Sequence, residues 1–269
     1  MPSTHAGAGN PLRPDLTRSS ALGGAVRKGF GAAWQNRVSI LLLQAAMAAA
    51  VASYYCWPAA TAIFSRLAAW QHAGGVLYAG LAMAFAGGIL SELSLIYFQN
   101  KGRWTAAHLD NMVFKTIFFF VNGSIVYEFY TYQTYWFGEG TAWSVLLPKI
   151  MVDQLIYSVI WSLPFQTFLF RWHHLRYSGR RLWMELDWSF VVERMLPILI
   201  TNWMFWIPGV LFIYSMPSVL QMPLAIFATA IWSVLLSAVA RHDEPDASAT
   251  MPGLVPEVAI ESADDRASV

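Results

Sequence analysis

Long apolar runs recur along the chain with only short polar breaks between them. Each has about 20 residues or more, the length an α-helix needs to cross the hydrocarbon core of a bilayer. A barrel strand would instead alternate apolar and polar residues over about ten positions. The pattern predicts an all-α, multi-pass transmembrane bundle of about six helices. They run approximately over Val38–Phe64, Ala73–Phe98, Met112–Tyr132, Val145–Phe170, Phe190–Tyr214 and Pro217–Ala240.

The fifth and sixth predicted helices are separated by a very short polar break, residues 215–218. Two full spans are one interpretation, and a re-entrant hairpin is the alternative. Either arrangement satisfies the backbone hydrogen bonds internally, as lipid requires. The count of six spans therefore depends on this pair.

Composition agrees with a membrane protein. Hydrophobic residues make up 57% of the 269 positions and charged residues 12%, about half the charged fraction of a typical soluble domain. These values exclude a soluble globule and a disordered chain, and a formal net charge of +1 gives no field for binding nucleic acid. The single cysteine, Cys56, allows neither an internal disulfide nor a cysteine-based zinc cluster. Packing and lipid must hold the fold.

Basic residues are unevenly shared between the two ends of the predicted helices. Lys and Arg in short loops are retained on the cytoplasmic or matrix side. With six spans, both tails and the second and fourth loops lie on one side, whereas the other side holds Arg66. We therefore expect both termini to be inside, in the inner membrane of a bacterium or a mitochondrion. The basic side carries Arg13, Arg18, Arg27, Lys28, Arg37, Lys101, Arg103, Arg171, Arg176, Arg180, Arg181, Arg241 and Arg266.

The two ends of the chain differ from its middle. Residues 1–20 are rich in Gly, Ser, Pro and Arg and predict a disordered lead. From Ala21 a four-residue apolar period predicts an amphipathic helix on the inner membrane surface, with an organellar transit peptide as the alternative. We divide the chain into an N-terminal tail (1–37), a transmembrane domain (38–240) and a disordered acidic tail (241–269). The apolar stripe consists of Leu22, Val26, Phe30 and Trp34.

Ionisable residues also lie inside the predicted spans. A charge in hydrocarbon costs at least a few kcal/mol, so such residues usually face a bundle interior or a water-filled cavity. The rise of about 1.5 Å per residue distributes them over an inner and an outer layer, and each layer contains both signs. The inner layer holds Glu92, Lys115, Glu193 and Arg194, and the outer layer holds Glu128, Lys149 and Asp153.

These charges have two interpretations. In the first they line a gated aqueous path, with Glu92 and Asp153, the deepest acids, as the leading candidates. In the second they are structural: charges near an interface snorkel to water, and Lys149 and Asp153, four residues apart on one helix face, neutralise each other. The candidates for pore-lining or buried charges are Glu92, Lys115, Glu128, Lys149 and Asp153.

Nothing in the sequence favours an enzyme. His173 and His174 resemble the histidine boxes of membrane di-iron oxygenases, which need more histidines than the six in this chain. Ser124 lacks the strand–turn–helix context of a nucleophile elbow, and phosphate-binding or dinucleotide-binding loops are absent. We expect no catalytic residue, metal or cofactor. The expected partner is the lipid bilayer, nucleic acid is not expected, and self-association into a homo-oligomer is left open.

A set of motifs extends over residues 85–240. Glycine-led segments begin at Gly87 and Gly123, and an Asp-Gln pair and a Thr-Asn-Trp run follow. These motifs resemble the Mpv/PMP family of small multi-pass proteins of peroxisomal and mitochondrial inner membranes, which also has bacterial members. The matching positions are Gly87, Gly123, Tyr130, Asp153, Gln154, Thr201, Asn202, Trp206, Pro208, Pro217, Trp232 and Ser237.

The resemblance is that of a divergent member. The family's Gly-Pro stands here as Gly123 and Ser124, and its Trp-Pro pair is split by Ile207. Members of the family are described as non-selective or weakly cation-selective pores, so the resemblance implies a channel or a membrane-homeostasis role and no enzyme. We expect a permeability pathway for ions or small solutes. The alternative is a non-transporting structural or assembly protein of the membrane.

Overall fold

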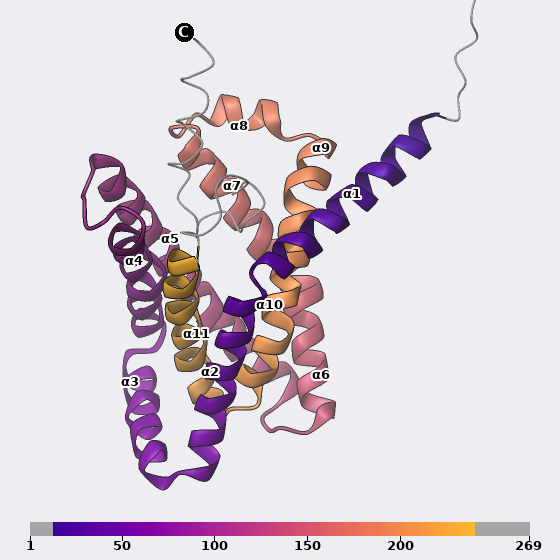
Figure 1. Ribbon diagram of the computed structural model, residues 1–269. Helices are drawn as coiled ribbons and strands as arrows, with labels where there is room; N and C mark the ends of the chain where they lie inside the picture. Colours follow the sequence, from indigo (N-terminus) through magenta and orange to yellow (C-terminus); the bar gives the residue numbers. More distant parts are fainter. Residues whose placement is uncertain (1–12, 240–269) are drawn as a thin grey trace, which may run out of the picture.

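The computed structural model describes residues 13–239, and this part of the chain consists of helices joined by short loops. Figure 1 shows them packed side by side, with α1 extending away from the bundle. The helices are α1 (Arg13–Gln35), α2 (Arg37–Cys56), α3 (Pro58–Met83), η1 (Ala84–Ile89), α4 (Leu90–Phe98), α5 (Ala106–Phe137), α6 (Trp143–Met151), η2 (Val152–Ser162), α7 (Leu163–His174), α8 (Gly179–Glu185), α9 (Trp188–Phe190), η3 (Val191–Met195), α10 (Leu196–Tyr214) and α11 (Ser218–Val239). The η segments are π-helical.

Six continuous helical stretches in the described residues are long and apolar enough to cross a membrane. The expected all-α, multi-pass bundle is therefore confirmed, and its fifth and sixth segments are each long enough to span by themselves. The stretches are Arg37–Cys56, Pro58–Phe98, Ala106–Phe137, Trp143–His174, Trp188–Tyr214 and Ser218–Leu235.

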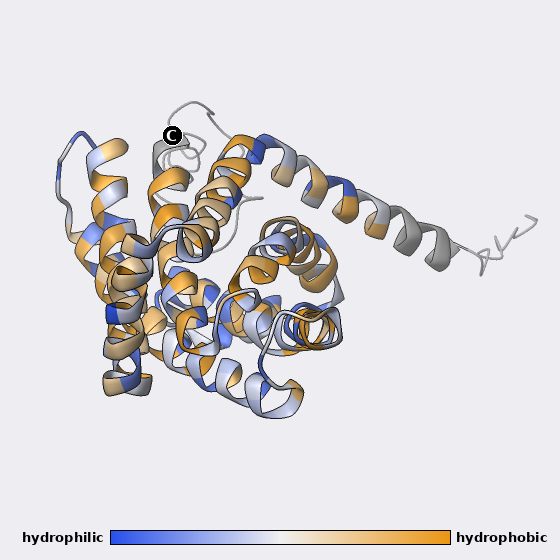
Figure 2. Ribbon diagram, turned by 90° about the horizontal axis from the view of Figure 1, so that it is seen from below, coloured by the Kyte–Doolittle hydropathy of each residue, from blue (hydrophilic) through white to orange (hydrophobic). Residues whose placement is uncertain are grey.

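Bulky apolar side chains cover the outside of the bundle. Leu41 on α2, Ile117 on α5 and Ile160 on η2 are each more than 60% exposed. Figure 2 shows that hydrophobic residues recur along all of the long helices. Large apolar patches of this kind are rare on soluble monomers, whereas in a bilayer they face acyl chains.

The boundary between the first two spans differs from the prediction. The apolar run suggested one helix to Phe64, but the chain turns at Trp57, where the backbone is extended (φ −128°, ψ 107°), and α3 begins at Pro58. Proline suits the first turn of a helix because the N–H that it lacks has no partner there. The Ala-rich residues after Pro58 continue the apolar run without a polar break, so hydropathy alone did not reveal the turn.

The second span is bent inside the bundle. Gly75 has φ 51°, in the left-handed region, and the chain kinks there. The side-chain amide of Gln71 donates to the carbonyl of Gly75 at 3.1 Å. Further along, α3 continues into η1 and α4, and all three pack against α5.

Glycines allow η1 and α3 to approach α5 at backbone distance. A Cβ on Gly88 would lie 2.6 Å from Cα of Thr116, and a Cβ on Gly123 would lie 2.9 Å from the carbonyl oxygen of Ala79. Small residues at such crossings are typical of membrane helix pairs, because association there depends on close packing.

We expect Gly88→Ala to lower the melting temperature of the purified protein in detergent. The added methyl group would meet the backbone of Thr116, which cannot rotate away, and overpacking of this kind costs about 1–3 kcal/mol. The control is Gly31→Ala, because nothing lies within 4 Å of that Cβ position and alanine favours a helix. A wild-type melting temperature for Gly88→Ala would contradict the close contact.

The loops lie at the two ends of the bundle in the order that six spans require. In Figure 1, α1, the α4–α5 loop and the α7–α9 region lie at one end, and the turns after α2, α5 and α10 lie at the other. Most of the loop lysines and arginines are therefore at the first end. That this end faces the cytoplasm or matrix stays a prediction.

Helix α1 starts earlier than expected and buries an unexpected face. It begins at Arg13, within the segment predicted to be disordered. It packs against α10, where a Cβ on Gly29 would lie 2.8 Å from Cβ of Ile200 and the Thr201 hydroxyl donates to the Gly29 carbonyl at 3.0 Å. Small residues make this contact because they bring the two backbones together.

The predicted apolar stripe of α1 points away from the bundle. All four of its side chains are exposed, so the stripe is free to contact a membrane surface, which stays a prediction. Residues 1–12 of the predicted lead and the acidic tail 241–269 lie outside the described residues. The exposed stripe consists of Leu22, Val26, Phe30 and Trp34.

Candidate functional site

The candidate site is built on η2, which lies in the middle of the fourth span. A π-helix bonds each carbonyl to the N–H five residues on, and such segments are often found at functional sites. Pro164 follows η2 closely, and proline has no N–H. Residue 164 therefore cannot donate an α-helical hydrogen bond to the carbonyl of Ile160, which favours a departure from the regular pattern here.

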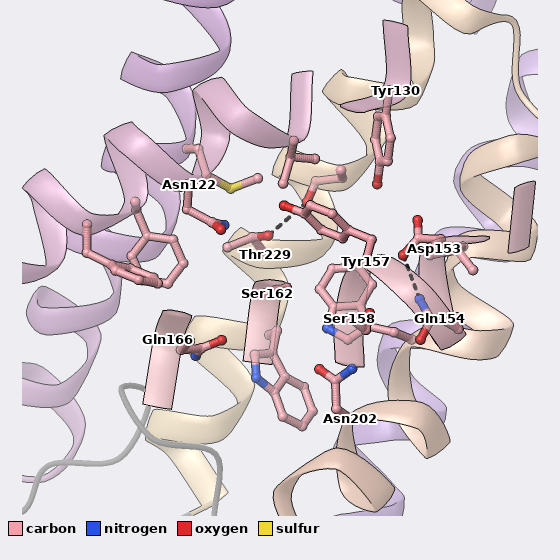
Figure 3. Close-up of a pocket in the computed structure, with 18 residues that line it drawn as sticks. Asn122, Tyr130, Asp153, Gln154, Tyr157, Ser158, Ser162, Gln166, Asn202 and Thr229 are labelled. Carbon is pink, nitrogen blue, oxygen red and sulfur yellow. Dashed lines mark hydrogen bonds between the residues drawn. The ribbon is translucent and has the colours of Figure 1, made fainter. Parts of the chain in front are cut away.

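The wide turns of η2 direct a row of polar side chains into the bundle. Four of them, Gln154, Ser158, Ser162 and Gln166, recur every four residues through η2 and the start of α7. Figure 3 shows them facing α10 and α11, with Asn122 of α5 on another side. A polar stripe facing inward from a membrane helix is the arrangement expected of a site.

These side chains border an internal cavity of about 110 Å³. A water molecule needs roughly 10–15 Å³ by the same measure, so the cavity has room for several waters or one small solute. The lining comes from five of the six spans: Met83, Phe118, Phe119, Asn122, Val126, Tyr130, Asp153, Gln154, Tyr157, Ser158, Ser162, Gln166, Asn202, Trp206, Val210, Ala225, Thr229 and Trp232.

Asp153 is the acid of this cavity. It is 6% exposed and accepts hydrogen bonds from the Tyr214 hydroxyl and from Nε2 of Gln154, at 2.9 Å. Nε2 of Gln133 in turn donates to the Tyr214 oxygen at 2.9 Å. The carboxylate is therefore held by neutral donors from its own helix and from α10.

Lys149 does not pair with Asp153, contrary to the expectation. Its Nζ lies 3.5 Å from Oγ1 of Thr134 and 5.8 Å from the centre of the Tyr214 ring. Within residues 13–239, no Lys, Arg or His nitrogen lies within 4.0 Å of the Asp153 carboxylate. The regular four-residue alignment assumed for the pair is lost because η2 begins at Val152, between the two residues.

Several buried polar atoms of the lining residues have no hydrogen-bond partner. These atoms are Oε1 of Gln154, the hydroxyl of Tyr157 and Nε1 of Trp232. A buried unsatisfied polar group costs about 1–3 kcal/mol.

Glu92, the other deep acid, does not line this cavity. Its two carboxylate oxygens accept from Nδ1 of His108 at 2.7 Å and from Nζ of Lys115 at 2.8 Å. The three residues are at most 5% exposed, and their side chains link α4 to α5. Lys115 is thus buried in an ion pair and does not snorkel, and the sequence interpretation missed His108.

Glu128 departs from the expectation more strongly. It is exposed on the outer surface of α5, so it is neither buried nor part of the cavity. The glycine contacts turn the opposite face of α5 towards α3, and Glu128 lies away from that face. Glu193 and Arg194 are also exposed, as the snorkelling interpretation required.

Half of the positions that carry the family resemblance line the cavity. They come from α5, η2, α10 and α11, which are far apart in sequence: Tyr130, Asp153, Gln154, Asn202, Trp206 and Trp232. The others lie elsewhere. Gly87 and Gly123 are at helix contacts, and the Thr201 hydroxyl donates to a carbonyl of α1. Pro208 is inside α10, and Pro217 is in the turn that follows it. Ser237 donates to the Ser233 carbonyl.

The sequence interpretation missed several neutral members of the site, although the family resemblance had singled out Tyr130, Gln154 and Asn202. Its search of the spans weighed charges and so passed over the other uncharged polar residues, whose cost in lipid is smaller. The four-residue polar repeat was a usable signal for the residues of the fourth span. No comparable pattern marked those on α5 and α11. The missed lining residues are Asn122, Tyr157, Ser158, Ser162, Gln166 and Thr229.

The histidine pair lies outside the cavity. Nε2 of His173 is 2.9 Å from a carboxylate oxygen of Asp110, and its ring stacks on Phe114 with centroids 4.1 Å apart. Among residues 13–239, no group of three His, Cys, Asp or Glu side chains is placed to hold a metal ion.

Comparisons of the chain with protein-family models, with curated proteins and with solved structures find no match. Residue chemistry and geometry must therefore carry the functional argument.

Proposed function

We propose that the protein provides a permeability pathway for small polar solutes or ions across the membrane, and that the η2 cavity is its central compartment. The observation that carries this proposal is the cavity itself, which has polar side chains and an acid in its wall and lies inside a bundle of helices long enough to span a membrane. Polar groups are costly in such a position and usually mark a solute or ion path. We also propose that the protein is a member of the Mpv/PMP family and that it lies in an inner membrane.

Different kinds of contact flank the cavity on its two sides. Towards the end that carries α8, Phe118 packs on Phe165 and Phe170, with ring centroids 5.7 and 4.9 Å apart. Towards the other end, Gln133 and Tyr214 form a hydrogen-bonded layer beside Asp153. An aromatic layer on one side and a polar layer on the other are the kinds of contact that a gated path would open.

The second candidate function is a non-transporting structural or assembly protein of the membrane, with a role in membrane homeostasis. The Glu92 network favours it, because that acid is fully occupied by Lys115 and His108. In this view, the charged side chains inside the spans form ion pairs that hold neighbouring helices together. The two functions predict different effects when the cavity is filled.

Filling the cavity is expected to stop permeation. Ser158 is 6% exposed and lines the cavity, so Ser158→Phe would place a ring inside it. We expect solute flux into proteoliposomes, measured by stopped-flow light scattering with urea and with potassium chloride, to fall at least tenfold. The matched control is Ile160→Phe, which adds volume to a side chain that is 71% exposed on the same segment.

Both variants must elute as folded protein in gel filtration before their flux is compared. Equal flux in Ser158→Phe, Ile160→Phe and wild type would contradict the pathway. So would wild-type vesicles no more permeable than protein-free ones, and either result would favour the structural role.

A further inference from the structure

The carboxyl group of Asp153 has no basic partner in the cavity. Among residues 13–239, Asp153 is the one acid of the lining, which includes no Lys, Arg or His. Lys149, the nearest basic residue along the chain, is turned to Thr134 and to the Tyr214 ring. A buried carboxylate is costly unless it is paired, and two neutral donors compensate it only in part. The site is therefore electrostatically suited to a cation.

Aromatic rings form much of the wall. They suit an organic cation, because an ammonium group within about 6 Å of a ring centroid is attracted to the negative face of the ring. Rings also offer apolar surface to the carbon atoms of such a ligand. A bare alkali ion would instead need a shell of oxygens to replace its water. The ring-bearing lining residues are Phe118, Phe119, Tyr130, Tyr157, Trp206 and Trp232.

Free hydrogen-bond acceptors lie on the same segment as the carboxylate. Oε1 of Gln154 and the hydroxyl of Tyr157 have no partner, and both residues line the cavity with Asp153. A primary ammonium carries three N–H donors, as lysine does. The carboxylate can accept from one of them, and the two free oxygens are further acceptors among the lining residues.

The volume limits the size of the ligand. Benzene occupies an engineered cavity of about 150 Å³, so the cavity of about 110 Å³ takes a molecule smaller than benzene. An alkylammonium ion with a short carbon chain meets this limit. Larger amines would require the helices to separate.

We propose that the cavity binds a small organic ammonium ion, with the ammonium group on Asp153 and the carbon atoms against the aromatic wall. This inference rests on the proposed function, since it names the class of solute that occupies the same compartment. Binding is nevertheless measured separately from flux. The two proposals can therefore fail independently.

The test is equilibrium dialysis of purified protein in detergent against radiolabelled ethylammonium. We expect saturable binding at one site per chain, displaced by unlabelled ethylammonium. Equal concentrations of ethanol, acetate and potassium should displace it at least tenfold less well. Ethanol is of similar size but uncharged, acetate is organic but negatively charged, and potassium is a cation without carbon atoms. The three competitors therefore test size, sign of charge and organic character separately.

Variants locate the site. Asp153→Asn keeps an acceptor for Tyr214 and removes the charge, and we expect at least tenfold weaker binding. Tyr157→Phe keeps the ring and removes the free hydroxyl, with an expected loss of about threefold. Glu128→Gln removes an exposed acid of α5 and should bind as wild type does. Melting temperatures establish that each variant is folded.

Three outcomes would overturn the inference: undiminished binding in folded Asp153→Asn, displacement by ethanol as effective as by ethylammonium, and no saturable binding to folded wild type. If binding is absent but Ser158→Phe still blocks flux, the pathway stands with another solute. If ethylammonium binds but filling the cavity leaves flux unchanged, the site stands and the pathway fails.

Discussion

Replacement of Glu92 by alanine is expected to destabilise the folded protein by about 3–5 kcal/mol, the usual cost of removing one partner from a buried ion pair. Lys115 and His108 would keep their buried positions and lose the carboxylate that both of them contact. Both residues are buried, with Lys115 5% and His108 1% exposed. We expect a large fall in melting temperature in detergent, or loss of the folded fraction.

Two further variants test the cause of this loss. Glu128→Ala removes an exposed acid from a span and should leave the melting temperature close to that of wild type. The double variant Glu92→Met with Lys115→Met removes both charges together, and well-packed apolar replacements of buried ion pairs are often neutral or stabilising. We expect it to recover most of the stability. If Glu92→Ala melts as wild type does, the network contributes little to the fold.

Asp153→Asn is expected to reduce permeation at least tenfold while the protein stays folded. The asparagine oxygen still accepts from Tyr214, so the layer of Gln133 and Tyr214 is retained, whereas the cavity loses the one acid among its described lining residues. Single-channel recording in a planar bilayer is the measurement. Discrete openings in wild type that become rare, or change ion selectivity, in Asp153→Asn would place this acid on the path.

The two acids together distinguish the proposed functions. If the protein is a pathway, Glu92 governs stability and Asp153 governs flux. If it is a structural or assembly protein, wild type gives a silent bilayer, and Asp153→Asn changes only the melting temperature. Equal conductance in folded wild type and Asp153→Asn would show that Asp153 does not line the pathway.

The sequence was sufficient for the class of fold and for most of the helices. Apolar runs of membrane length dictate helices because no other open backbone arrangement satisfies its hydrogen bonds in lipid. It failed at Trp57, where an apolar run contains a turn, and at Arg13, where a polar composition concealed a helix. Hydropathy measures the preference of a segment for lipid. It therefore does not reveal a turn between two helices that are both apolar. It also does not distinguish a polar helix from a polar disordered segment.

The sequence also indicated that charges lie in the spans, and it singled out Glu92 and Asp153 as the leading acids. Only the tertiary structure decided their roles, because role depends on what the neighbouring helices bring. α5 brings His108 and Lys115 to Glu92, while α10 brings a neutral tyrosine to Asp153. One carboxylate is thereby neutralised inside the protein, and the other is left without a cationic partner among the described residues.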